Sequence, residues 1–254
     1  MIRCYQSARA RYHGRMDERA GGHPRVAFFG GSFDPPHLGH VAVARAARTA
    51  LGLDTVLFAP VGAQPLKPLG STAAFADRVA MTRLAIASEA GFAVSLVDGP
   101  KPFGAPNYTL ETLLRLRGEL PGGGTLYCLM GADSFAGLKG WHRAVEIPFA
   151  APLIVASRPG QKLDDLKAAL PAGLTIEAKE TPQEMKAEIE VRCYSVRNKA
   201  GESAPFFLLP GLEIEISASD IREQLRGGAG GSGTGRPLVP SSVSEYIHAH
   251  GLYC

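Results

Sequence analysis

Residues 26–40 read Val-Ala-Phe-Phe-Gly-Gly-Ser-Phe-Asp-Pro-Pro-His-Leu-Gly-His, and the rest of the chain can be interpreted from this stretch. The apolar run at 26–29 is short and bounded by glycine, which is typical of a buried strand. Gly30 and Gly31 favour a tight turn that comes close to a ligand. The alanine-rich run at 38–51 favours a helix. Such a junction directs backbone N–H groups and the positive end of a helix dipole to one point, where a phosphate would bind.

Two histidines, His37 and His40, lie three residues apart and share one face if the helix begins there. A Gly-Gly turn alone is a weak signal, and a lone histidine more often packs or forms a hydrogen bond than takes part in catalysis. Two histidines, the carboxylate of Asp34 and a glycine pair within eleven residues are harder to explain by packing. The spacing matches neither the dinucleotide pattern Gly-x-Gly-x-x-Gly nor the Walker pattern that ends in Gly-Lys-Ser/Thr.

Short apolar runs alternate with helix-like segments along the chain. Strands are predicted at 26–29, 55–59, 92–96, 126–130, 153–156, 174–177 and 213–216, and helices at 38–51, 73–89, 107–120, 163–170, 217–222 and 240–250. The charged stretch at 184–197 fits either a helix or a surface loop. Asn107 or Thr109 is a candidate cap of the helix at 107–120, and Ser219 or Asp220 of the helix that begins near 217. This alternation predicts right-handed βαβ units, and hence an α/β fold with a Rossmann-like, doubly wound parallel sheet covered on both faces. In such folds ligands bind beyond the carboxyl ends of the strands.

The composition fits one large α/β domain, because 45% of the 254 residues are hydrophobic and only 20% are charged. No apolar run approaches the roughly 18 residues that a membrane-spanning helix needs. No short hydrophobic region of the secretory type follows the basic start, so a soluble cytoplasmic protein is expected. The four cysteines show no Cys-x-x-Cys spacing, so neither a zinc site nor a disulfide framework is indicated.

The first 24 residues form a basic extension that we expect to be disordered, ahead of a single domain at 25–254. Residues 1–25 contain six arginines against Asp17 and Glu18, a net charge of +4, so the remaining chain carries about −1 of the total of +3. The fold itself is therefore not expected to bind nucleic acid. For the extension, an unstructured tail or an upstream start codon near Met16 is favoured over a tether, and an organelle transit peptide is a third interpretation.

The stretch at 30–40 resembles the signature of the His-x-Gly-His nucleotidyltransferase superfamily, most closely that of the bacterial nicotinate-nucleotide adenylyltransferases. The resemblance covers the chain from about residue 26 onward through several separated matches. These are Pro65-Leu-Lys67, Asn107-Tyr-Thr-Leu-Glu-Thr112, Gly131-Ala-Asp133, Trp141, Ile216-Ser-Ala-Ser-Asp-Ile-Arg222 and the stretch at 243–253. The chain departs from the family in its basic extension, in a long insertion at 158–206 and in a Gly/Ser spacer at 227–235.

The resemblance implies transfer of the adenylyl group of ATP to nicotinate mononucleotide, which gives deamido-NAD and pyrophosphate in NAD biosynthesis. A phosphate of the mononucleotide would attack the α-phosphorus of ATP in line and without a covalent intermediate, so the protein supplies positioning and charge stabilisation. Mg²⁺ would arrive with ATP and be held mainly by phosphate oxygens and water. The implied partners are these two substrates, with no nucleic acid and no membrane, and assembly into a homo-oligomer stays open.

The resemblance also implies roles for individual residues. The catalytic set would be His37, His40, Lys67 and Arg222, as donors and cations on the phosphates. ATP would bind to Gly30, Gly31, Ser32, Phe33, His37, His40, Gly131, Asp133, Ser219, Ile221 and Arg222. Nicotinate mononucleotide would bind to Tyr108, Thr109, Trp141 and Lys67. No metal-ligating residue is assigned.

Two other functions fit parts of this pattern. Pantetheine-phosphate adenylyltransferases share the His-x-Gly-His chemistry, but the chains that resemble them are shorter and lack the Tyr-Thr and Trp pair. A regulatory nucleotide-binding protein without turnover would usually have lost His40, Lys67 or Arg222, and this chain keeps all three. The fold alone would not separate an enzyme from such a regulator.

Overall fold

The computed structural model describes residues 23–66, 70–157, 163–179, 189–212, 216–226 and 237–253. The strands are β1 (Arg25–Gly31), β2 (Thr55–Pro60), β3 (Phe92–Val94), β4 (Thr125–Gly131), β5 (Leu153–Ala156), β6 (Leu174–Ala178), β7 (Arg192–Asn198) and β8 (Ser203–Leu209). The α-helices are α2 (Leu38–Leu51), α3 (Phe75–Ala85), α4 (Thr109–Glu119), α5 (Ala132–Ala136), α6 (Ile147–Ala150), α7 (Leu163–Ala169), α8 (Ala218–Arg226) and α9 (Ser241–Ala249). Short 3-10 turns are η1 (Pro102–Gly104), η2 (Leu138–Gly140) and η3 (Ala144–Glu146).

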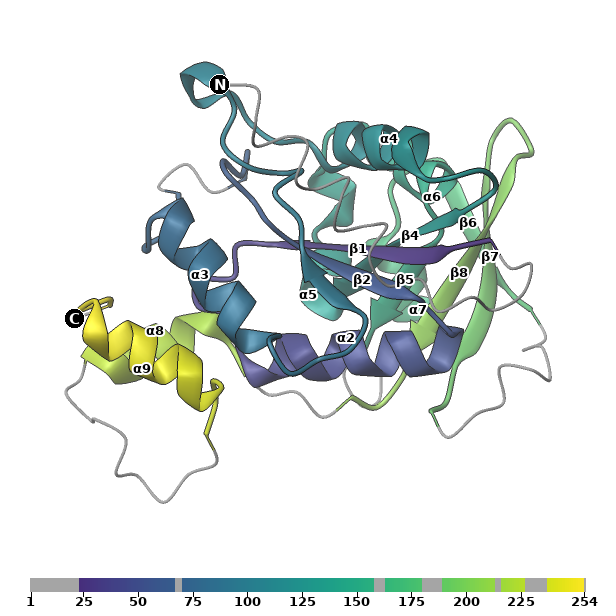
Figure 1. Ribbon diagram of the computed structural model, residues 1–254. Coiled ribbons are helices and arrows are strands. Elements are labelled where there is room, and N and C mark those ends of the chain that lie inside the picture. The colour runs from purple at the N-terminus through teal and green to yellow at the C-terminus, as the bar shows by residue number, and fades with distance from the viewer. Residues whose placement is uncertain are drawn as a thin grey trace.

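The strands join into one sheet with the order β3-β2-β1-β4-β5-β8-β7-β6 (Figure 1). The pairs from β3 to β8 are parallel, whereas β7 pairs antiparallel with both β8 and β6. The predicted doubly wound α/β fold is therefore confirmed, with an antiparallel extension at one edge. The stretch at 184–197, for which the sequence allowed a helix or a surface loop, overlaps strand β7, which begins at residue 192. Residues 180–188 and the strand expected at 213–216, apart from Ile216, lie outside the described residues.

Helices cover both faces of the sheet and create two hydrophobic cores. One core packs α2, α3 and α9 against the side of β1 that carries Ala27 and Phe29. The other packs α4, α5, α6 and α7 against the side that carries Val26 and Phe28. In Figure 1, α4 lies above the strands and α2 below them. Burial on both faces explains why the parallel strands are continuous apolar runs without a polar alternation.

The strand order reverses direction at β1, and this reversal determines where a ligand can bind on the sheet. The chain winds outward from β1 to β2 and β3 on one side, and from β4 to β5 and β8 on the other. At such a switch point the loops after neighbouring parallel strands diverge and leave a crevice at their carboxyl ends. The loops that follow β1 and β4 carry the sequence motifs at 32–40 and 131–142, so both motifs are brought to this crevice.

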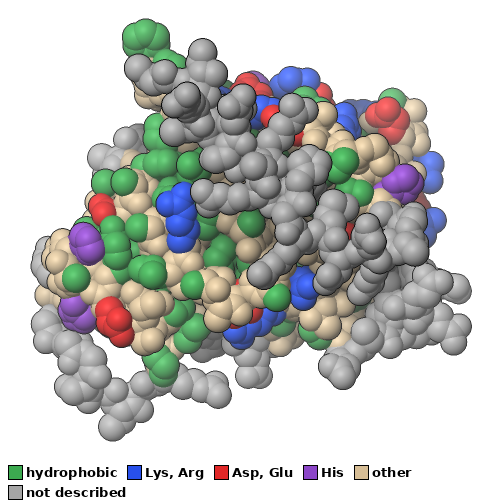
Figure 2. All heavy atoms as spheres, in the orientation of Figure 1, with side chains coloured by type: hydrophobic (Ala, Val, Ile, Leu, Met, Phe, Trp, Pro, Cys, Tyr) green, Lys and Arg blue, Asp and Glu red, His purple; other side chains and the backbone are tan. Residues whose placement is uncertain are grey.

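The last two residues of the basic extension predicted at 1–24 contact the body of the fold. Residues 1–22 lie outside the described ranges. His23 and Pro24 contact the segment before β4: His23 Nδ1 lies 2.8 Å from the carbonyl oxygen of Gly122, and the N–H of Thr125 donates to the carbonyl of Pro24 over 2.7 Å. On the face shown in Figure 2, basic and acidic side chains of the described residues are scattered over the surface. None of the described helices is long and apolar enough to cross a membrane.

One charged residue of α3 is buried, against the sequence pattern. The periodicity of 73–89 predicts an amphipathic helix in which Arg78 is offset from the apolar stripe, yet Arg78 is only 2% exposed. Its guanidinium donates to three backbone carbonyls: Ser32 over 2.6 Å, Val61 over 2.8 Å and Ala73 over 3.2 Å. Because these carbonyls belong to the loops after β1 and β2 and to the start of α3, one side chain holds three segments together.

Replacing Arg78 by methionine should lower the free energy of unfolding by roughly 3 kcal/mol or more, because three buried carbonyls lose their donor. Arg83→Met is the matched control, since Arg83 is exposed on the same helix and should change stability by less than about 0.5 kcal/mol. Urea unfolding monitored by circular dichroism measures both. Equal, small effects of the two substitutions would contradict the role given to Arg78.

Candidate active site

A cleft of about 1200 Å³ opens at the carboxyl ends of β1, β4 and β5. Most residues that the sequence assigned to ATP or to the mononucleotide line it. They are Gly30, Gly31, Ser32, Phe33, His37, His40, Tyr108, Thr109, Gly131, Asp133, Trp141, Ser219 and Arg222. Lys67 lies outside the described residues, although Leu66 and Gly70 on either side of its loop line the cleft. Ile221 is buried and does not line it, and its N–H donates to the carbonyl of Ser217.

The glycine pair belongs to the strand and not to the turn that was expected. Gly30 and Gly31 pair with Ala59 and Pro60 of β2. Packing explains the lack of a side chain at Gly30, because a Cβ there would lie 2.7 Å from the ring of Phe28. The turn begins after them, and its left-handed residue is Phe33, with φ of 47°. The expected strand, loop and helix are present, but the loop comprises residues 32–37.

The two histidines form one stacked unit at the start of α2. Their ring centroids are 3.7 Å apart with an interplanar angle of 29°. His37 is the N-cap of the helix, and its backbone N–H donates to Nδ1 of His40 over 3.2 Å. The ring of Phe33 packs against that of His40 in an edge-to-face contact, with ring centroids 4.9 Å apart. These contacts hold both rings at the N-terminus of α2.

Both histidines are held in the neutral form. Burial lowers the pKa of His37 to about 4, and burial together with His37 lowers the pKa of His40 well below its usual value. Because Nδ1 of His40 accepts a hydrogen bond from the backbone, the proton of the neutral ring lies on Nε2. His40 can therefore present an N–H donor to the cleft without carrying a positive charge.

The helix α8 brings the guanidinium of Arg222 and the hydroxyl of Ser219 to the cleft beside the histidine loop. Nη1 of Arg222 donates to the backbone carbonyl of Asp34 over 2.6 Å, and Nη2 donates to Oγ of Ser219 over 3.1 Å. The sequence suggested Ser219 or Asp220 as the cap of this helix, but Oγ of Ser217 accepts the N–H of Ser219 over 3.2 Å. Ser219 thus faces Arg222, next to the histidine loop.

The other end of the cleft is aromatic. Trp141 is half-buried, packs against the core below α4 and lines the cleft. Tyr108 precedes α4, and its ring lies 4.3 Å from the imidazole of His142, centroid to centroid. Thr109 is the first residue of α4, so the N-terminus of that helix opens beside the two rings. This end of the cleft therefore combines aromatic side chains with the backbone N–H donors at the start of α4.

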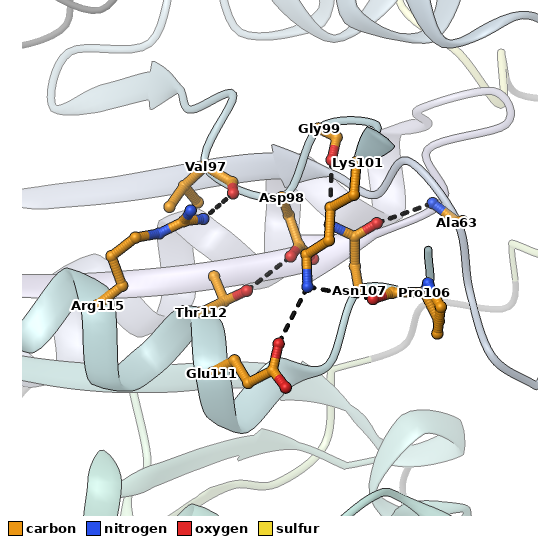
Figure 3. A network of polar contacts seen from close by, with 10 residues as sticks. All are labelled: Ala63, Val97, Asp98, Gly99, Lys101, Pro106, Asn107, Glu111, Thr112 and Arg115. Carbon is orange, nitrogen blue, oxygen red and sulfur yellow. Dashed lines mark hydrogen bonds and ion pairs between the residues drawn. The ribbon is translucent and has the colours of Figure 1, made fainter. Parts of the chain in front are cut away.

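A polar network fixes the loop that leads to this aromatic end (Figure 3). The sequence suggested Asn107 or Thr109 as the helix cap, but the N-cap is Tyr108. The side chain of Asn107 instead joins two loops: Oδ1 accepts the N–H of Ala63 over 3.0 Å, and Nδ2 donates to the carbonyl of Gly99 over 3.0 Å. Asp98 is buried and accepts the hydroxyl of Thr112 over 2.7 Å, and its pKa is raised by burial. The loop of Ala63, which continues toward residue 67, is thereby tied to the loop of Tyr108.

Comparison with known proteins agrees with this geometry. The sequence profile described as cytidylyltransferase-like matches residues 28–224. The probable nicotinate-nucleotide adenylyltransferase of Gloeobacter violaceus is 39% identical over 229 residues, which cover 90% of this chain and 96% of that protein. The chain belongs to the nicotinate-nucleotide adenylyltransferase family. A second relative of the same name, from Pelobacter propionicus, is 34% identical over 90% of this chain and 98% of its own length.

Solved structures support the fold of this adenylyltransferase. The nicotinic acid mononucleotide adenylyltransferase of Plasmodium falciparum complexed with NaAD superimposes with a TM-score of 0.60, at 16% identity, over 91% of this chain and 98% of that chain. A putative nicotinate-nucleotide adenylyltransferase from Vibrio parahaemolyticus gives 0.52, at 15% identity, over 88% of this chain and 99% of its own.

Several lining residues of the adenylyltransferase were missed by reasoning from the sequence. Gln64 accepts the hydroxyl of Ser32 over 3.1 Å, and His142 stacks on Tyr108. Asp98 and Asn107 also line the cleft. His142 directly follows Trp141, so its position could have been noticed. Gln64 and Asp98 have no local pattern, because only the pairing of the loops brings them to the cleft.

The pKa of His37 predicts a pH dependence of stability. Between pH of about 6.5 and 4 the unfolded chain binds a proton at His37 that the folded chain does not, so the free energy of unfolding falls as the pH drops through this window. The difference is worth on the order of 3 kcal/mol at most. We expect His37→Asn to reduce this loss, as measured by urea unfolding at several pH values. The same substitution at exposed His248 is the control, and an unchanged slope in His37→Asn would contradict the assignment.

Proposed function

We propose that the protein joins ATP and nicotinate mononucleotide to give deamido-NAD and pyrophosphate in the cytoplasm. The observation that carries this proposal is that one cleft has neutral histidine donors and Arg222 at one end and Trp141 with the N-terminus of α4 at the other. These two ends suit a polyphosphate and an aromatic base with an anionic substituent. Membership of the family, with relatives that bear this name, supports the same reaction.

The chemistry is a direct displacement at phosphorus. A phosphate oxygen of the mononucleotide attacks the α-phosphorus of ATP, and the bond to the bridging oxygen of the β-phosphate breaks, so that pyrophosphate leaves with the electron pair of that bond. No protein nucleophile is needed. Catalysis then depends on alignment of the two substrates and on donors aimed at the oxygens on which negative charge grows.

The residues at the histidine end have complementary roles. His40 would donate its Nε2–H to the α-phosphate region, while His37, which stacks on it, would contact the neighbouring phosphates. Arg222 and Lys67 would supply the positive charge that the neutral histidines lack. A donor that interacts more strongly with the transition state than with bound ATP raises the rate, and His40 would act in this way where negative charge grows on the α-phosphate. Asp133, which is exposed at the start of α5 and lines the cleft, would bind a ribose hydroxyl.

Mg²⁺ is proposed to enter with ATP. Among the described residues, no group of three or more His, Cys, Asp or Glu side chains is placed to hold a metal ion. The ion would be held mainly by phosphate oxygens and water, since Mg²⁺ keeps several waters in most sites. When bound, it would neutralise charge on the phosphates. Lys67, Arg222 and the histidines would orient the same phosphates from the protein side.

The acceptor assay tests the function directly. Purified protein with ATP and Mg²⁺ should release pyrophosphate with nicotinate mononucleotide and not with 4′-phosphopantetheine. Release with the pantetheine acceptor alone would support the alternative adenylyltransferase, and release with neither would support a regulatory nucleotide-binding protein. The number of subunits stays a prediction to be measured in the same preparation.

His40→Ala should lower kcat by about 10²–10³-fold, because it removes a donor that acts where charge develops in the transition state. ATP binding should change little, since the remaining contacts with the phosphates are kept. Stopped-flow measurement of pyrophosphate release and equilibrium binding of ATP separate the two effects. His248→Ala is the control for loss of a histidine. A near-normal kcat in His40→Ala would refute the assigned role.

Trp141 should report binding of the acceptor, because it is the only tryptophan in the chain. Stacking on the pyridine ring should change its fluorescence saturably as nicotinate mononucleotide is added. Backbone donors at Tyr108 and Thr109 suit a carboxylate better than a carboxamide, so nicotinamide mononucleotide should bind roughly 1.5–3 kcal/mol more weakly. Unchanged emission with normal turnover would show that Trp141 only packs in the core.

A further inference from the structure

The segment that follows α9 returns to the catalytic loop. The hydroxyl of Tyr253 donates to Oδ1 of Asp34 over 2.8 Å. Both side chains are buried, at 6% exposure for Tyr253 and 5% for Asp34. Asp34 lies three residues before His37, in the loop between β1 and α2. A residue more than two hundred positions away thus contacts the loop that carries the histidines.

The backbone after α9 is bent so that this contact can form. The N–H of Gly251 donates to the carbonyl of His248 over 3.2 Å, and the N–H of Leu252 donates to that of Ile247 over 3.0 Å. Gly251 is left-handed, with φ of 56°, and so is Tyr253, with φ of 68°. That region is unfavourable for a bulky aromatic residue, and such conformations persist where the surroundings hold them in place. Here the buried hydrogen bond to Asp34 and the packing of the ring provide that support.

Asp34 is the point where several parts of the cleft meet. Its carboxylate also accepts the N–H of Thr72 over 2.6 Å and of Ala73 over 3.0 Å. Its backbone carbonyl accepts Nη1 of Arg222 over 2.6 Å. The carboxylate of Asp34 therefore holds the segment before α3, and its backbone carbonyl holds α8 beside the histidine loop. Burial and the bond to Asp34 raise the pKa of Tyr253 well above its usual value, so the hydroxyl remains a donor.

We propose that Tyr253 is a positioning residue for adenylyl transfer: its hydroxyl orients the Asp34 carboxylate and so fixes the loop that carries His37 and His40. The inference rests on the proposed function. Two prolines, at 35 and 36, connect Asp34 to His37 and leave the loop little freedom. The ring of His37 stacks on that of His40, so a shift of Asp34 is passed to both rings. Small misplacements of this kind reduce turnover more than they reduce binding.

The chain provides a matched control in a second tyrosine of the same region. The hydroxyl of Tyr246 on α9 donates to Oδ1 of Asp77 on α3 over 2.9 Å. This pair has the same chemistry as Tyr253 and Asp34, and it also links the region after residue 240 to the body of the fold. Neither Tyr246 nor Asp77 lines the cleft. Tyr→Phe at the two positions therefore removes the same bond with and without a connection to the histidines.

The experiment compares Tyr253→Phe with Tyr246→Phe in the full chain. Both should lower Tm by roughly 2–4 °C, with the larger drop in Tyr253→Phe, because its pair is buried whereas Tyr246 and Asp77 are half-buried. Only Tyr253→Phe should lower kcat, by about tenfold, with KM for ATP and for nicotinate mononucleotide within about twofold of wild type. Hydrogen exchange at the amides of Thr72 and Ala73 should increase in Tyr253→Phe and stay unchanged in Tyr246→Phe.

Three results would overturn the proposal. Wild-type kcat in Tyr253→Phe would show that the hydroxyl does not position the loop, and loss of the fold in this variant would show that it serves stability alone. An equal loss of kcat in Tyr246→Phe would also count against it, because the effect would then follow from general loosening. These outcomes are distinct from failure of the proposed function, which would appear as absent pyrophosphate release by the wild-type protein.

Discussion

The hydrogen bonds of the Arg78 guanidinium hold the geometry of the cleft. The loops after β1 and β2 leave neighbouring parallel strands and must diverge, so their backbone carbonyls lack the partners that a sheet would give them. Arg78 supplies donors to Ser32, Val61 and Ala73 from within the interior. Its rigid planar fork suits several carbonyls at once better than a lysine would. With these loops fixed, Asp34 and the histidines have defined neighbours.

Most of the parallel part of the fold could be predicted because the strands from β1 to β5 are decided by their local sequence. Runs such as 153–156 are apolar throughout and bounded by breakers, which is the pattern of a strand buried on both faces. Other features depend on partners that are distant in the sequence. β7 forms because β8 and β6 lie on either side of it, although its residues are mostly polar or charged. Gly30 and Gly31 look like a turn in the sequence, but pairing with β2 keeps them in the strand.

In the candidate site, too, some features follow from local sequence and others depend on residues that are distant in the chain. The histidine pair, Trp141 and Arg222 could be selected from motifs, because their spacing in the sequence is itself distinctive. The protonation of the histidines could not, since it depends on burial and on the stacking of two rings. Asn107 resembles a helix cap in the sequence, but it joins two loops because Ala63 and Gly99 are brought beside it by β2 and β3. Long-range pairing, rather than residue type, decides such roles.

The contact between Asp34 and Tyr253 spans 219 positions of the sequence, and this separation constrains the order in which the protein can assemble. Asp34 is synthesised early and Tyr253 late, and closing so long a segment carries an entropic cost that local elements do not have. The contact that supports the histidine loop can therefore form only once the chain has been made as far as Tyr253, so a chain that stops short of this residue would lack that support for its catalytic loop.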